Sequence, residues 1–152
     1  MRLIAAFCIA ASVAFAAAPN FSGTWKLNAS KSDFGQFPAP SSMVQTINHD
    51  DPKLKVEVKQ AGEMGEFSFA MNYTTDGKEC KNPGFGGTET KSIVKWEGEL
   101  LTIEMKGTMG DNSAFTMKDK WALSGEGKVL TIQRHFSSAM GEMDQKFTLE
   151  KQ

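Results

Sequence analysis

The feature that most constrains the fold of this chain is a two-residue alternation of apolar and polar side chains. In residues 53–60 apolar side chains alternate with lysine and glutamate, and the same pattern recurs in residues 66–75 and 100–107. After Pro19 no segment sustains a 3.6-residue apolar period for three turns. One apolar and one polar face on each segment is typical of an antiparallel sheet with a single buried side.

Ten segments carry this signal, with turn residues between them. The predicted strands are residues 21–28, 43–49, 53–60, 66–75, 78–82, 88–97, 100–107, 114–124, 127–137 and 142–150. Strands with short connections and no crossover helix form a meander. We therefore predict an all-β fold, an up-and-down antiparallel β-barrel or clam of about ten strands.

The predicted connections fall into two classes by length. Four carry tight-turn residues, at 50–52, 76–77, 98–99 and 125–126, and a glycine comes first in the last two, as a type II′ turn requires. Five are longer, at 29–42, 61–65, 83–87, 108–113 and 138–141. Successive connections of a meander alternate between its two ends. The order therefore predicts a barrel with one closed end and one looser end, which we call the mouth.

The predicted mouth is rich in methionine and phenylalanine. Its candidate portal residues are Phe34, Phe37, Met64, Phe85, Met109 and Met140. Flexible apolar side chains on loops suit the passage of an apolar ligand. The alternative is that these side chains fold inward and close the barrel.

The first 16 residues are interpreted as a signal peptide. A minimal basic start precedes an unbroken run of apolar and small residues that ends at Ala16, too short for a comfortable membrane span. Cleavage there leaves residues 17–152 as a secreted or periplasmic domain. Cys8 leaves with the signal, so Cys80 has no intrachain partner and is expected to be a buried thiol.

One arginine remains after signal removal, and the alternation places it inside the barrel. Arg134 has the parity of the apolar residues of its strand, and Asp119 has that of the preceding strand. Pairing the two strands about the 125–126 turn makes Asp119 and Arg134 diagonal neighbours. Pairing Phe136 with Met143 on the other side brings Gln145 opposite Arg134.

A charge inside a barrel must be paired or hydrogen-bonded. The favoured interpretation is an Asp119–Arg134 ion pair, with Arg134 stacked on a tryptophan such as Trp25. The alternative is an anchor for a ligand carboxylate, in which Arg134 is a forked donor and Gln145 assists.

Two short motifs resemble a known group of barrels. The segment Phe-Ser-Gly-Thr-Trp-Lys-Leu at residues 21–27 resembles the opening strand of fatty-acid-binding proteins, and its Gly23-x-Trp25 is similar to the signature of the wider lipocalin-like (calycin) group. Residues 95–98 also resemble a hairpin of the fatty-acid binders. The run 23–34 is similar to the start of small secreted bacterial lipocalin-like proteins of uncharacterised function. The resemblance implies a lipocalin-like barrel with an interior.

The chain departs from the fatty-acid-binding pattern in two places. Residues 29–42 are too short and too rich in proline for the helical lid of that family, so we expect a barrel without one. Gln145-Lys146-Phe147 stands where the family carries an Arg-x-Tyr that holds the fatty-acid carboxylate. Arg134 lies one strand earlier.

These observations predict an extracytoplasmic, non-enzymatic binding protein for a small apolar or amphipathic molecule, such as a fatty acid or another lipid-like ligand. The candidate binding residues are Tyr73, Asp119, Trp121, Arg134 and Gln145. A formal net charge of −1 offers no electrostatic surface for nucleic acid. We expect a monomer with no cofactor and no membrane span after signal cleavage.

Two other functions stay open. The barrel interior could be packed solid, leaving a structural or interaction module. The methionines could also bind Cu(I), because soft thioethers select that ion; Met140-x-x-Met143 and Met105-x-x-x-Met109 are the nearest groupings, with Cys80 or His49 as helpers. No catalytic group is predicted, because His49 is expected in a turn and His135 is expected to point outward.

Overall fold

The computed structural model describes residues 17–63 and 65–152, and its framework is ten β-strands. They are β1 (Gly23–Leu27), β2 (Ser42–Asp50), β3 (Lys53–Gly62), β4 (Gly65–Thr74), β5 (Asp76–Pro83), β6 (Glu89–Glu97), β7 (Leu100–Thr108), β8 (Ala114–Ser124), β9 (Val129–Ser138) and β10 (Gly141–Lys151). Each predicted strand is present, and the ends differ by at most two residues. The predicted signal peptide, with Cys8, lies outside the described residues.

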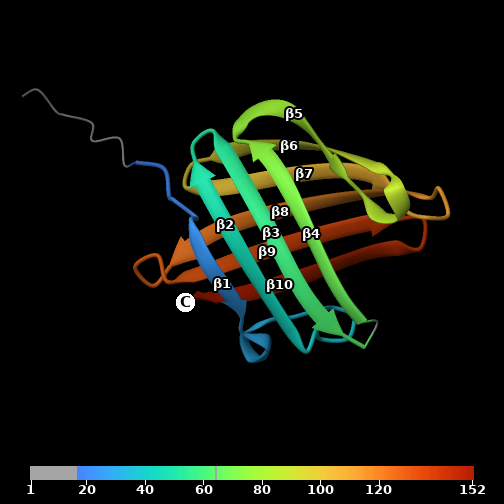
Figure 1. Ribbon diagram of the computed structural model, residues 1–152, viewed down its shortest axis with the longest axis horizontal. Helices are drawn as coiled ribbons and strands as arrows, with labels where there is room; N and C mark the ends of the chain where they lie inside the picture. The colour runs from blue at the N-terminus through green and yellow to red at the C-terminus, as the bar shows by residue number, and fades with distance from the viewer. Residues whose placement is uncertain (1–16, 64) are drawn as a thin grey trace, which may run out of the picture.

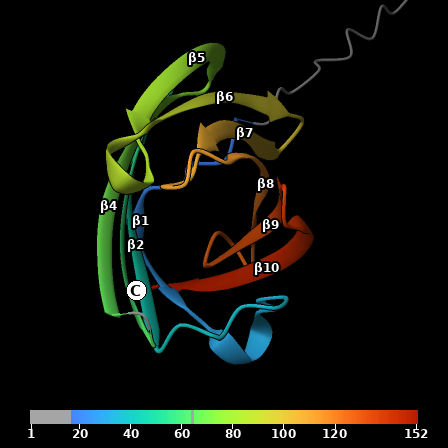
Figure 2. The ribbon, with the colours of Figure 1, turned by 90° about the vertical axis from the view of Figure 1, so that its right-hand side faces the viewer.

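The strands form one antiparallel sheet that curls into a nearly closed barrel (Figures 1 and 2). Their order is β4-β3-β2-β1-β10-β9-β8-β7-β6-β5, so every chain neighbour is paired except β4 with β5. The pairing of β1 with β10 joins the two ends of the chain within the sheet. The all-β up-and-down fold predicted from the alternation is therefore confirmed.

Side chains, rather than a backbone ladder, join β4 to β5. The Asn82 side chain accepts a hydrogen bond from the Asn72 amide at 2.7 Å and donates one to the Asn72 carbonyl oxygen at 3.0 Å. The Thr74 amide also donates to Cys80 Sγ, at 3.1 Å. Cys80 is a buried free thiol, as expected. These contacts satisfy the edge of β4 only near the closed end of the barrel.

Two connections predicted to be long are tight hairpins. Gly62 pairs with Gly65, and Ser138 pairs with Gly141, so each turn holds two residues. In both places glycine with positive φ, 102° at Gly65 and 126° at Gly141, lets the strand continue into the turn. The longer connections at the mouth are residues 28–41, 84–88 and 109–113. In Figure 1 the closed-end turns lie at the top and left, and the connections of the mouth lie at the right and bottom.

The described residues contain two 3-10 turns, η1 (Ala29–Lys31) and η2 (Phe85–Gly87), and no α-helix. The connection between β1 and β2 therefore carries no helical lid, as expected from its length.

The Gly-x-Trp motif closes the end opposite the mouth. Gly23 has φ 142°, in the region that disfavours a side chain. This bend lets Phe21 turn beneath the sheet, where the Trp25 indole N–H donates to the Phe21 carbonyl oxygen at 2.8 Å. Phe21 and Trp25 are both completely buried.

An aromatic cluster fills this closed end. Phe21 stacks on Trp96 with ring centroids 5.9 Å apart and meets Trp121 edge-on at 5.7 Å. Around them lie fully buried aliphatic side chains from β3, β7, β9 and β10, namely Leu54, Leu101, Leu130, Ile132 and Leu149. The closed half of the barrel is therefore packed solid, which gives the fold its stability.

Candidate ligand-binding site

The inner face of β4 becomes more exposed toward the mouth. Tyr73, Met71, Phe69 and Phe67 all face the interior, because the β3 residues opposite the first three are buried. Near the closed end Tyr73 is mostly covered, whereas Phe69 and Phe67 are each 42% exposed. Large aromatic side chains that point into a barrel and still reach solvent indicate an interior that is open at this end.

On the opposite wall of the barrel, formed by β8, β9 and β10, the inner side chains also become more exposed toward the mouth. Along β9 the inner residues Leu130 and Ile132 are fully buried, while Arg134 and Phe136 are half-buried. Half-buried inner side chains of β8, β9 and β10 beyond the closed-end core include Met117, Arg134, Phe136, Met143, Gln145 and Phe147. Together with Phe67, Phe69 and Met71 they line what we call the open half of the interior.

Asp119 and Arg134 form an ion pair at the boundary between the two halves. Arg134 Nε donates to Asp119 Oδ1 and Nη2 donates to Oδ2, each at 2.8 Å. The side chains are 3% exposed for Asp119 and 29% exposed for Arg134. Burial lowers the pKa of Arg134, but the Asp119 charge and hydrogen bonds outweigh it, so its pKa rises and the guanidinium stays charged.

The two residues are directly opposite in the sheet, and the predicted diagonal relation is wrong. Ser124 pairs with Val129, so the β8–β9 turn holds four residues rather than the two at 125–126. Gly125, Glu126 and Gly127 all have positive φ. This wider turn moves the register by two residues, which brings Asp119 into a forked pair with Arg134.

The expected partners of the ion pair are only partly correct. Gln145 is opposite Arg134 in the sheet, as predicted, but its amide donates to the Phe34 carbonyl oxygen at 3.1 Å. Arg134 lies over the ring of Phe147 at 5.1 Å rather than over a tryptophan. The cation over Trp25 is Lys151, at 5.3 Å.

Tyr73 and Trp121, the other predicted binding residues, approach the ion pair from the closed half. The Trp121 indole N–H donates to Asp119 Oδ2 at 3.5 Å. Burial, followed by the negative charge of Asp119, raises the pKa of Tyr73, so its phenol stays neutral. Trp121 is buried in the closed-end core, which leaves Tyr73 and Arg134 nearer to the open half.

The predicted portal residues divide into two kinds. Phe34 folds inward and packs edge-on against Phe147 at 5.9 Å. Its connection is fixed to β10 by a β-bridge between Asp33 and Lys146. Phe37 and Met140 are exposed, and Met109 is half-buried. The β1–β10 side of the mouth is therefore covered, as the inward-folding alternative expects, while the β4 side is open.

Two portal candidates cannot be placed. Met64 lies outside the described residues. The backbone of Phe85 begins η2, but its side chain is outside the described part of the molecule.

The expectation that His49 lies in a turn is wrong. His49 is a buried inner residue of β2, whose Nδ1 accepts a hydrogen bond from the Phe21 amide at 3.2 Å. Its Nε2 is 3.3 Å from Asp51 Oδ1, which also accepts hydrogen bonds from Thr75 and Trp96. Both ring nitrogens are occupied, so this imidazole supports the closed end and is not placed to act as a base.

The predicted outward direction of the second histidine is correct. His135 is exposed and lies 2.7 Å from an Asp144 carboxylate oxygen. Within residues 17–63 and 65–152, no three or more His, Cys, Asp or Glu side chains are grouped to hold a metal ion. Across the same residues, no helix is long and apolar enough to span a membrane.

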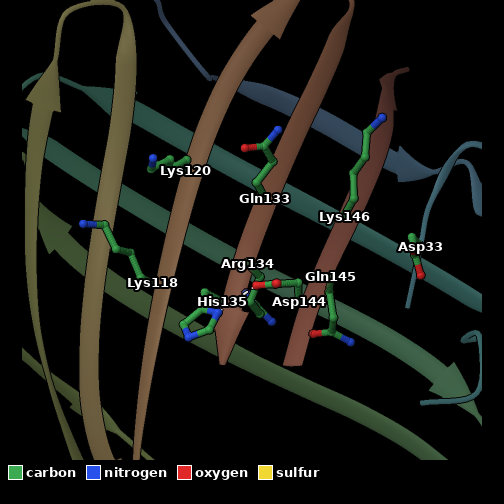
Figure 3. Close-up of a pocket in the computed structure, with 9 residues that line it drawn as sticks. All are labelled: Asp33, Lys118, Lys120, Gln133, Arg134, His135, Asp144, Gln145 and Lys146. Atoms are coloured by element: carbon green, nitrogen blue, oxygen red, sulfur yellow. Dashed lines mark hydrogen bonds and ion pairs between the residues drawn. The ribbon is translucent and has the colours of Figure 1, made fainter. Parts of the chain in front are cut away.

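A hollow lies on the outer surface of β8, β9 and β10 (Figure 3). It has a volume of about 530 Å³ and is lined by Asp33, Lys118, Lys120, Gln133, Arg134, His135, Asp144, Gln145 and Lys146. Lys118, Lys120, Gln133 and Lys146 are exposed and point away from the barrel. This polar outer hollow lacks the apolar lining of the open half.

Sequence comparison finds no matching family model and no matching curated protein. Solved structures do match. Zebrafish ileal bile acid-binding protein, in complex with cholic acid, aligns with a TM-score of 0.60 and 19% identity over 87% of this chain and 98% of that one. A REP1-NXSQ fatty acid transporter aligns with a TM-score of 0.59 and 13% identity, over 87% and 96% of the two chains.

Secretory abundant heat soluble protein 4 from Ramazzottius varieornatus is also similar, with a TM-score of 0.52 and 13% identity over 87% of this chain and 94% of that one. At these identities the likeness concerns the fold. The ten-stranded order, the seam between β4 and β5 and these alignments together show that the chain has the calycin-like β-barrel fold indicated by its opening segment.

Proposed function

We propose that this protein is an exported carrier that holds a small apolar or amphipathic molecule in the open half of its barrel and catalyses no reaction. The observation that carries the proposal is the exposure of Phe67 and Phe69, which face the interior and are still 42% exposed. A ligand lying against them would bury apolar surface at roughly 25 cal/mol per Å².

The comparisons support a binding role of this kind. One similar structure is a bile acid-binding protein in complex with cholic acid, and another is named a fatty acid transporter. Both ring nitrogens of His49 already have partners, the Phe21 amide and the Asp51 carboxylate, which also favours a binding role over catalysis by this imidazole.

Titration with Nile red, a neutral apolar dye, tests the proposal. We expect saturable binding with one dye per chain. In Phe69→Lys a charge must be desolvated when the dye binds, so we expect affinity to fall at least about tenfold. The control is Ser68→Lys, which places the same charge on the outer face of the same strand.

Two results would contradict the carrier. The first is the absence of saturable dye binding, which would favour the solidly packed barrel. The second is an equal loss of affinity in the inner and outer lysine variants, which would place the dye somewhere other than the interior.

Export is proposed from residues 1–16, which have the apolar core of a signal peptide. Expression of the full chain in a bacterial host followed by fractionation and N-terminal sequencing tests it. We expect the periplasmic or secreted protein to begin at Ala17. A protein that retains Met1 in the cytoplasmic fraction would contradict export.

A further inference from the structure

Among the described residues, no unpaired positive charge lies in the barrel interior. Every lysine in residues 17–63 and 65–152 is exposed. Arg134 is the arginine of this region, and both carboxylate oxygens of Asp119 already accept its hydrogen bonds. A ligand carboxylate that entered the barrel would lose its hydration and would compete with Asp119 for one guanidinium.

Two neutral polar groups inside the barrel do lack a partner. Gln45 Oε1 and Ser92 Oγ are buried side-chain atoms with no hydrogen bond, on side chains of residues only 7% and 1% exposed. Leaving such a group buried and unpaired destabilises the protein, because its hydration is lost and nothing replaces it. A bound molecule that supplies partners to them recovers that cost.

Both groups face the interior from the mouth side of their strands. Gln45 is opposite Val58 of β3, and Ser92 is opposite Met105 of β7, both of which are buried inner residues. Counted from the mouth, Gln45 is the second inner residue of β2, after Met43. Ser92 is likewise the second inner residue of β6, after Thr90. They are therefore next to the open half rather than in the aromatic core of the closed end.

We propose that the natural ligand is a neutral amphiphile with a hydroxyl head group, such as a long-chain alcohol, and not a carboxylate. This inference rests on the proposed carrier function. A hydroxyl both donates and accepts, so it can pair with either group: it can donate to the Gln45 amide oxygen, or exchange a hydrogen bond with the Ser92 hydroxyl. The aromatic and methionine side chains of the open half accommodate the apolar chain.

Displacement of Nile red by two ligands of equal chain length tests the head group. Oleyl alcohol is compared with oleate at pH 8, each below its critical aggregation concentration. We expect the alcohol to displace the dye at a concentration at least about tenfold lower. Equal or tighter binding of oleate, or displacement by neither ligand, would overturn the neutral head group.

The outcomes separate this inference from the carrier function. If Nile red binds saturably and Phe69→Lys weakens it, the carrier stands, whichever head group is preferred. If the dye does not bind at all, the carrier fails and the inference fails with it.

Two variants locate the recognition. Gln45→Leu removes the amide, and we expect affinity for oleyl alcohol to fall roughly 3- to 10-fold. Gln133→Leu is the matched control, because Gln133 is exposed on the outer face of β9. An equal effect of the two leucine variants would contradict recognition by Gln45.

Asp119→Asn tests whether the Asp119 charge prevents Arg134 from binding a carboxylate ligand. The expected result is a gain of oleate binding. Without the opposing charge, Arg134 becomes a free cation inside the barrel, so we expect oleate affinity to rise at least about tenfold while oleyl alcohol affinity changes little. Far-UV circular dichroism confirms that the variant is folded. Unchanged oleate binding in a folded variant would contradict the role assigned to the Asp119 charge; if it does not fold, the two-ligand comparison and Gln45→Leu decide the question.

Discussion

Asp119 and Arg134 are opposite each other on β8 and β9 and share two parallel hydrogen bonds of 2.8 Å. The carboxylate is almost completely buried, while 29% of the arginine side chain is exposed. The pair therefore separates a solid core from a solvent-reachable interior, and it leaves that interior electrically balanced.

Breaking this pair from one side is expected to destabilise the protein strongly. Arg134→Met leaves the Asp119 carboxylate buried and unpaired, which costs about 3 to 5 kcal/mol in the free energy of unfolding measured by urea denaturation. The double variant Asp119→Leu/Arg134→Met removes both charges, so we expect it to be within about 1 kcal/mol of the wild type or more stable. A double variant as unstable as the single one would contradict this account.

The two halves of the barrel are expected to respond differently to the loss of a phenyl ring. Phe21→Ala empties space in a fully buried aromatic cluster and should cost about 3 to 5 kcal/mol. Phe67→Ala removes a ring that is 42% exposed, so it should cost less than about 1.5 kcal/mol and weaken Nile red binding. Thermal melts and dye titrations of the two variants check both effects; similar losses of stability would argue against an open half.

The seam between β4 and β5 is expected to depend on one side chain. Asn82→Ala removes the group that pairs with both the amide and the carbonyl of Asn72, at an expected cost of about 1 to 3 kcal/mol. Hydrogen exchange at the Asn72 amide should become faster. Asn72→Ala is the matched control, because Asn72 contributes only its backbone to the seam. Equal acceleration in the two variants would show that Asn82 does not hold it.

Acid is expected to weaken the closed end through Asp51. The Thr75 hydrogen bond, with smaller contributions from Trp96 and His49, outweighs burial and lowers the pKa of Asp51 below its ordinary 3.8. A lowered folded-state pKa stabilises the protein above the unfolded value, and that stability is lost as the pH falls through the folded value. Because the side chain is 54% exposed, the effect should stay below about 1 kcal/mol.

Urea denaturation of Asp51→Asn between pH 2 and pH 7 checks this sign. The variant should be less stable than the wild type at pH 7, and the difference should shrink below about pH 4. Asp50→Asn, which changes the exposed neighbouring carboxylate, is the control. A difference that stays constant across the whole range would contradict a contribution from the Asp51 charge.

Much of the site could be predicted from strand parity. The alternation correctly placed Arg134 and Asp119 inside and His135 outside, and the Phe136–Met143 pairing correctly set Gln145 opposite Arg134. Gln45 has the same parity signal within residues 43–49, so it could have been found as an inner polar residue. Its lack of a hydrogen bond depends on every neighbour that surrounds it, which parity does not describe.

The errors arose where the chain turns. His49 was assigned to a turn because aspartates and a proline follow it, yet β2 continues to Asp50 and the imidazole is buried against Phe21. Three consecutive residues with positive φ widen the β8–β9 turn beyond the glycine-first pattern, and the register moves with it.

By itself, the sequence determined the ten strands, their antiparallel order and the face to which each side chain belongs, because a strand repeats every two residues whatever its neighbours are. Only the tertiary structure decided how far each inner residue is covered, which donor meets which acceptor and where the sheet stays open. Those features depend on strand register and on contacts between segments far apart in the chain, such as Gln145 with Phe34. The two-residue alternation places both Phe21 and Phe67 toward the interior. Only the closure of the sheet buries Phe21 and leaves Phe67 exposed enough to contact a ligand.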